Sequence, residues 1–206
     1  MRETSRKEGV TVDLKGIKVG FGITGSHCTL ERVFKVLEIL HNDYGAEIVP
    51  VLSPALQTSE NRFGCPQKWQ DRLSCITDHP IITSIEAAEP IGPKKLLDVM
   101  VIAPCSGNTL AKLSHGIIDS PVLMAAKAQL RNGRPVVLAV STNDGLGING
   151  KNIGSLLATK NIYWVPFGQD DPVGKEYSLV AKMELLPETV KESLNRKQIQ
   201  PILIEY

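Results

Sequence analysis

The chain has 206 residues, of which 42% are hydrophobic and 22% are charged, and its formal net charge is +1. This composition is typical of one globular domain and excludes a disordered or strongly basic chain, so we expect neither nucleic acid nor an anionic membrane as a partner. No apolar run is long enough to span a bilayer, and the charged segment Met1–Gly9 lacks the apolar core of a signal peptide. We therefore expect a cytoplasmic protein.

Residues 1–14 are predicted to form a flexible N-terminal leader, and residues 15–206 a single α/β domain. Within that domain, apolar periodicity predicts strands and helices in alternation. In chain order they are a strand at Ile17–Ile23, a helix at Leu30–Leu40, strands at Glu47–Leu52 and Val99–Pro104, helices at Ser106–Ser114 and Pro121–Asn132, a strand at Pro135–Val140, a helix at Asn149–Thr159, a strand at Ile162–Val165 and a helix at Glu184–Lys197. The stretch Ser53–Gly92 is rich in Pro, Gly and polar residues, which predicts a helix with long loops.

Continuous apolar strands that alternate with helices favour a three-layer Rossmann-like or flavodoxin-like α/β fold, with a mainly parallel sheet and helices on both faces. In such sheets, ligands bind beyond the carboxyl ends of the strands. This chain concentrates Gly, Ser, Thr and Asn in three segments at those ends. These three segments are therefore the candidates for a binding site.

The first segment, Gly22–Thr29, follows the first predicted strand. Gly22 and Gly25 allow a ligand to approach the backbone, and the hydroxyl groups of Ser26 and Thr29 stand before a helix N-terminus, an arrangement that suits phosphate. The alternative is an ordinary strand-to-helix turn with a Ser or Thr N-cap. The glycines only approximate the G-x-G-x-x-G pattern, so we predict no NAD site here.

The second segment, Ala103–Leu110, leaves a strand and enters a helix. Ser106, Asn108 and Thr109 are short polar residues at the helix start, and Gly107 removes a side chain beside them. Capping by Ser106 is the simpler alternative. Because three polar residues and a glycine exceed what one cap needs, we predict that this segment is a phosphate-cradling loop.

The third segment, Ser141–Gly147, has enough glycines and polar residues for a ligand loop, but taken by itself it is better interpreted as an ordinary turn. Taken together, the three segments predict one pocket for an anionic ligand. Its binding residues are predicted to be Gly25, Ser26, Thr29, Ser106, Asn108, Thr109, Ser141, Thr142 and Asn143, with His27 and Asp144 as weaker contacts.

The sequence assigns no catalytic residue and no metal ligand. No spacing forms a Ser–His–Asp or paired-carboxylate pattern, and the four cysteines form no Cys-x-x-Cys or zinc pattern. The thiol of Cys105 is either activated by the helix N-terminus or packed and inert. His115, at a predicted helix C-terminus, is interpreted as a partner of the helix dipole.

These segments carry a family resemblance. Ala103–Leu113, followed by Gly116–Asp119, resembles the A-P-x-S-x-N-T-L-A-K-x-A-x-G-x-x-D signature of the flavoprotein family, which includes phosphopantothenoylcysteine decarboxylases and flavin prenyltransferases. Gly22–Thr29 is also similar to the flavin-phosphate loop of that family. The resemblance covers roughly residues 17–172. It implies that the predicted pocket is a cofactor site for FMN, in which His27 and Asp144 contact the substrate, and that the chain forms a homo-oligomer.

Within the family, Ser141–Gly154 and Asn161–Pro172 resemble the B subunits of dipicolinate synthases. That resemblance implies oxidation of dihydrodipicolinate to dipicolinate, a spore component, in the cytoplasm of a sporulating mother cell. It also implies a partner A subunit that binds NADP. A dicarboxylate substrate would need cations, and Arg62, Lys68 and Lys151 are candidates for that role or are solvated surface charges.

The chain departs from the other chemistries of the family at the same place. Ser141–Asp144 stands where flavin prenyltransferases carry Arg-Glu-Thr-Pro, and the Pro-x-Met-Asn-x-x-Met segment of the decarboxylases has no counterpart. These departures argue against prenyl transfer and cysteine decarboxylation. Two alternatives remain open, a non-catalytic structural subunit with a vestigial flavin or anion pocket, and an independent FMN-dependent decarboxylase.

Overall fold

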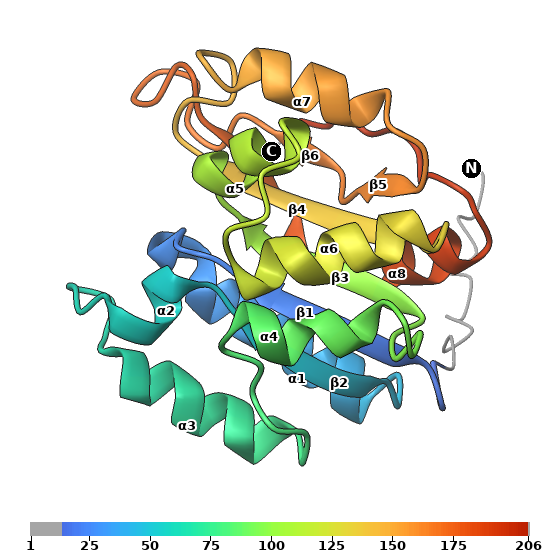
Figure 1. Ribbon diagram of the computed structural model, residues 1–206. Helices are drawn as coiled ribbons and strands as arrows, with labels where there is room; N and C mark the ends of the chain where they lie inside the picture. The colour runs from blue at the N-terminus through green and yellow to red at the C-terminus, as the bar shows by residue number, and fades with distance from the viewer. Residues whose placement is uncertain (1–13, 206) are drawn as a thin grey trace, which may run out of the picture.

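The structure is a computed structural model that describes residues 14–205 (Figure 1). Of the predicted leader, residues 1–13 lie outside the described part. Leu14 lies inside it, with a buried side chain and a backbone N–H that donates to the carbonyl oxygen of Tyr44 at 2.8 Å. Leu14 therefore packs with the domain rather than with a leader. No helix of the described residues is long and apolar enough to cross a membrane.

A mainly parallel sheet forms the middle layer of the molecule. Its strands are β1 (Lys18–Ile23), β2 (Glu47–Leu52), β3 (Val99–Cys105), β4 (Val136–Thr142), β5 (Ile162–Trp164), β6 (Phe167–Gly168) and β7 (Leu179–Ala181). The order is β2-β1-β3-β4-β7-β6, and β5 also pairs with β4. The five predicted strands are confirmed, and they pair in parallel.

Helices cover both faces of this sheet. They are η1 (His27–Thr29), α1 (Leu30–Asn42), α2 (Pro54–Thr58), α3 (Pro66–Ile76), α4 (Ile85–Ala88), η2 (Glu89–Ile91), α5 (Gly107–Ser114), α6 (Pro121–Arg131), α7 (Gly150–Leu157), η3 (Met183–Leu185) and α8 (Leu186–Leu194). In Figure 1, α4 and α6 lie in front of the sheet, α1 and α8 lie behind it, and α7 packs on α5 and β5. The predicted three-layer fold is confirmed.

Burial on both faces explains why β3 is apolar without alternation, since all seven of its residues are buried. The neighbouring strand β1 carries Gly22, which we predicted to admit a ligand. That prediction is wrong. A Cβ at Gly22 would lie 2.7 Å from Met100 Cε and 2.9 Å from Val122 Cγ1. The absent side chain therefore makes room for β3 and α6.

The segment Ser53–Gly92 contains α2, α3 and α4 rather than one helix with long loops. Its prolines misled the interpretation, because Pro54 and Pro66 are first residues of helices, where a missing N–H costs nothing. Tertiary packing then holds α3 in place. Trp69 is buried, and its ring centroid lies 5.1 Å from that of Phe34 in α1.

Two features of the C-terminal part differ from the predictions, the end of the last helix and a short hairpin. The last helix, α8, ends at Leu194, because Asn195 is its C-cap and Arg196 adopts a φ of 60°. The hairpin of β6 and β7 was not predicted, since strands of two and three residues show no periodicity. β7 runs antiparallel to the end of β4, with Thr142 opposite Leu179. The hairpin thereby reaches the edge of the sheet where the polar loops gather.

Candidate functional site

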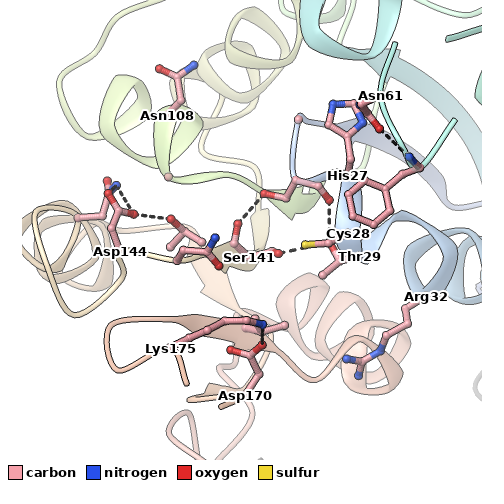
Figure 2. Close-up of a pocket in the computed structure, with 18 of the residues that line it drawn as sticks. His27, Cys28, Thr29, Arg32, Asn61, Asn108, Ser141, Asp144, Asp170 and Lys175 are labelled. Atoms are coloured by element: carbon pink, nitrogen blue, oxygen red, sulfur yellow. Dashed lines mark hydrogen bonds and ion pairs between the residues drawn. The ribbon is translucent and has the colours of Figure 1, made fainter. Parts of the chain in front are cut away.

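A cleft of about 1150 Å³ opens at the carboxyl ends of β1, β3 and β4 (Figure 2). Six segments contribute to it: the loop after β1, the first turn of α1, the start of α5, the loop after β4, the β6–β7 hairpin and the turn before α3. The lining residues are Gly25, Ser26, His27, Cys28, Thr29, Arg32, Asn61, Arg62, Phe63, Gly107, Asn108, Ser141, Thr142, Asn143, Asp144, Asn149, Asp170, Lys175 and Val180. The structure therefore brings together all the predicted site residues except Ser106 and Thr109.

The loop after β1 is tied to the end of β4 across the end of β3. The hydroxyl of Ser26 donates to the carbonyl oxygen of Ser141 at 2.6 Å. The hydroxyl of Thr29 donates to the carbonyl oxygen of Ser26 at 3.0 Å and lies 3.3 Å from Ser141 Oγ. Neither residue makes a side-chain cap to η1 or α1, so the predicted alternative of a simple N-cap is wrong. These hydroxyl groups fix the cleft wall instead.

Ser106 and Thr109 lie just behind the wall and stabilise the start of α5. Ser106 Oγ accepts the N–H of Thr109 at 3.4 Å and lies 3.0 Å from its hydroxyl. The N–H of Ser106 donates to the hydroxyl of Thr24 at 3.0 Å. Capping by Ser106 is thus present, and it leaves the next two N–H groups, of Gly107 and Asn108, without an acceptor among the described residues. Since both residues line the cleft, an anion there would meet unpaired donors.

Asp144 is held by its neighbours in the loop after β4. Its carboxylate accepts the hydroxyl of Thr142 at 2.5 Å, and both oxygens accept the side-chain amide of Asn149 at 2.9 Å. Asn152 donates in turn to the side-chain oxygen of Asn149 at 2.8 Å. This network uses much of the accepting capacity of Asp144 and stiffens the cleft wall. Its predicted contact with substrate stays a prediction.

His27 lies half-buried in the cleft wall, on the same side as Asn61 in Figure 2. Its Nδ1 is inaccessible to solvent and has no hydrogen-bond partner within residues 14–205. Burial lowers the pKa of the imidazole from its ordinary value, because a charged ring would lose hydration. His27 is therefore neutral at pH 7 and contributes no positive charge to the cleft.

The β6–β7 hairpin brings Asp170 and Lys175, which sequence reasoning missed. Lys175 Nζ lies 3.1 Å from Asp170, and the hydroxyl of Ser178 donates to the same carboxylate at 2.6 Å. Burial alone would raise the pKa of Asp170, but the hydrogen bonds from Ser178 and Lys175 outweigh it and lower that pKa. Figure 2 shows this pair and Asn108 on opposite sides of Ser141.

Sequence reasoning also missed Arg32 and Asn149 as cleft residues, and only the position of Arg32 in the sequence could have indicated its role. It stands one turn into the helix that follows the first loop, where a side chain can face back towards the loop. Its guanidinium lies 3.2 Å from Glu184, just before α8. Asn149 carries no pattern that separates it from a turn residue.

The remaining candidates occupy different environments. Cys105 is fully buried in β3 and burial raises the pKa of its thiol, which confirms the packed, inert interpretation. His115 is the C-cap of α5, with Nδ1 2.8 Å from the carbonyl oxygen of Ala111, as expected for a residue that satisfies a helix end. Lys68 pairs with Glu31 at 2.9 Å and Lys151 is an exposed residue of α7; neither lines the cleft, whereas Arg62 does.

A family model described as Flavoprotein matches residues 8–175. The chain belongs to the flavoprotein family. It is 54% identical over 192 residues to the B subunit of dipicolinate synthase from Bacillus subtilis (strain 168), covering 93% of this chain and 96% of that protein.

Solved structures agree with this family assignment. A crystal structure of the dipicolinate synthase B subunit from Bacillus halodurans superposes with a TM-score of 0.87 and 52% identity, covering 94% of this chain and 99% of that one. A dodecameric FMN-dependent UbiX-like decarboxylase from Escherichia coli O157:H7 superposes with a TM-score of 0.57 and 25% identity, covering 73% of this chain and 80% of that one.

The donor set of the cleft is compatible with the phosphate of a flavin mononucleotide. Two backbone N–H groups, of Gly107 and Asn108, have no acceptor in the described part of the chain, and the side-chain amide of Asn108 lines the same cleft. Ligand pockets are typically about 300–1,000 Å³, so the cleft has room for such a molecule. The hydroxyl groups of Ser26 and Thr29 are less suited, because they already donate to backbone oxygens.

Proposed function

We propose that this chain acts as the B-type subunit of a dipicolinate synthase, in the cytoplasm of a spore-forming bacterium. It would help to oxidise dihydrodipicolinate to dipicolinate together with a separate subunit that binds NADP. The observation that carries this proposal is the 54% identity to the Bacillus subtilis relative, which extends over 96% of that protein. Similarity over nearly the whole length supports a shared role better than a match confined to one motif.

The cleft supports a role in binding an anionic ligand. Its unpaired donors, at Gly107 and Asn108, stand at the N-terminus of α5, where the helix dipole favours negative charge. Asn108, Gly25 and Asn143 would hold the phosphate or ribityl part of FMN if the chain binds that cofactor, and FMN supplies reversible two-electron transfer. In this proposal the residues of the chain bind and orient the ligand. The chain is also proposed to form a homo-oligomer.

The test is reconstitution of the enzyme from two purified subunits. The chain is mixed with a dipicolinate synthase A subunit, dihydrodipicolinate and NADP, and both dipicolinate and NADPH are measured. We expect both products from the mixture and neither from the chain alone. If the mixture forms no more dipicolinate than the A subunit alone, the proposed function is wrong.

A pair of matched variants separates a binding role from a purely structural one. Asn108→Ala removes a cleft side chain that has no hydrogen bond within the described residues, whereas Asn42→Ala removes an exposed asparagine at the end of α1. We expect Asn108→Ala to lower the rate of the reconstituted enzyme about 10-fold or more and Asn42→Ala to leave it unchanged. Equal rates for both variants would favour the structural-subunit alternative.

A further inference from the structure

Among the cations that line the cleft, Arg62 differs in having no carboxylate partner in the described part of the chain. Arg32 pairs with Glu184, and Lys175 pairs with Asp170 at 3.1 Å. Arg62 forms no ion pair within residues 14–205, although it is exposed and lines the cleft. The guanidinium of Arg62 is therefore available to bind an anionic ligand in the cleft.

A closed turn places this guanidinium. Asn61 and Gly64 exchange two backbone hydrogen bonds, of 3.3 and 3.0 Å, and the side-chain oxygen of Asn61 accepts the N–H of Phe63 at 2.9 Å. Gly64 permits the turn with a φ of 139°, a value that L side chains rarely adopt. The guanidinium carbon of Arg62 lies 4.8 Å from the centroid of the Phe63 ring. Contact with that ring engages one face of the guanidinium and leaves its edge donors available.

The two carboxylates that line the cleft already have other partners, so they do not occupy the guanidinium of Arg62. Asp144 is engaged by Thr142 and Asn149, and Asp170 by Lys175 and Ser178. The cleft therefore offers an incoming anion two separate groups of donors. One is the guanidinium of Arg62, and the other is the pair of backbone N–H groups at the start of α5.

We propose that Arg62 is the specificity-determining residue that selects a dicarboxylate over a monocarboxylate. Its edge donors would bind one carboxylate in the two-bond geometry that suits a guanidinium. The N–H groups of Gly107 and Asn108 can receive one anion at a time, and this proposal assigns them to the second carboxylate instead of the phosphate of FMN. This inference rests on the proposed function, because that function supplies a ligand with two carboxylates on one ring. No covalent step is assigned to Arg62.

The test is calorimetric titration of the full chain, alone and with the A subunit, using pyridine-2,6-dicarboxylate and pyridine-2-carboxylate. We expect the wild-type chain to bind the dicarboxylate more tightly. Arg62→Ala should weaken dicarboxylate binding by about 10- to 100-fold, as the loss of a charge-assisted hydrogen-bonded pair predicts, and leave monocarboxylate binding unchanged. Arg62→Lys should restore part of the preference, since it keeps the charge but not the fork.

Arg131→Ala is the matched control, because Arg131 is an exposed arginine at the end of α6 that does not line the cleft. It should leave both affinities unchanged. An unchanged ratio of the two affinities in Arg62→Ala, or a wild-type chain that binds neither compound, overturns the role of Arg62. Dicarboxylate binding that depends on Arg62 in a chain that fails the reconstitution assay contradicts only the proposed function.

Discussion

Gly107 lies in a tightly packed part of the cleft wall, and replacing it with alanine is a direct test of that packing. A Cβ at this position would lie 2.6 Å from Asn149 Nδ2, 2.6 Å from Thr142 Oγ1 and 3.0 Å from Asp144 Oδ1. These atoms cannot withdraw freely, because the 2.5 Å and 2.9 Å hydrogen bonds to Asp144 hold the two side chains. The new methyl group must therefore displace the loop after β4 or the start of α5.

The expected size of the effect follows from two opposing terms. Overpacking costs about 1–3 kcal/mol, and a strained hydrogen bond adds to it. Replacing glycine with alanine in a helix returns at most about 1 kcal/mol, and less at the first residue of a helix such as α5. We expect Gly107→Ala to lower the free energy of unfolding by about 1–2 kcal/mol, which corresponds to a fall in Tm of about 2–8 °C.

Gly154→Ala is the matched control for this measurement. Gly154 lies inside α7 and is exposed. Apart from the backbone of α7 and the two adjacent residues, no atom of the described residues lies within 4 Å of the place that a Cβ would take, so alanine there should stabilise the chain by about 0.5–1 kcal/mol. Urea unfolding of both variants gives the free energies, provided that the slopes match that of the wild type. A Gly107→Ala chain as stable as the wild type would refute the packing argument.

Two more predictions concern His27 and Ser120. Burial holds the pKa of His27 in the folded chain below the 6.5 expected in the unfolded chain. At a pH between the folded and the unfolded pKa, the unfolded chain binds more protons than the folded chain. The free energy of unfolding therefore falls as the pH drops below about 6.5. His27→Gln should make the free energy of unfolding less dependent on pH between pH 7 and pH 5, and parallel curves for the two proteins would contradict this. Ser120 caps α6 by accepting the N–H of Leu123 at 3.3 Å, so Ser120→Ala should cost about 1 kcal/mol in the same urea assay, and a change within error would show that the cap contributes nothing.

The sequence alone determined the main elements of the sheet and the edge at which the site lies. Val99–Cys105 is apolar at every position because both of its faces are covered, and that pattern is visible without any tertiary information. The polar loops that begin at Gly25, Ser106 and Ser141 follow strands of a parallel sheet, whose carboxyl ends share one edge. Their meeting in one cleft was therefore predictable.

Only the tertiary structure decided which partner each polar side chain takes. Ser106 and Thr109 are residue types typical of a ligand loop, yet their hydroxyl groups are hydrogen-bonded to each other. The hydroxyl of Ser26 instead donates to the backbone carbonyl oxygen of Ser141, at the end of another strand. Asp170 and Lys175 reach the cleft through a hairpin too short to show periodicity. Periodicity records whether a residue faces the core, which is a local property. The partner of a hydroxyl or a carboxylate depends on segments far away in the chain, and packing brings those together.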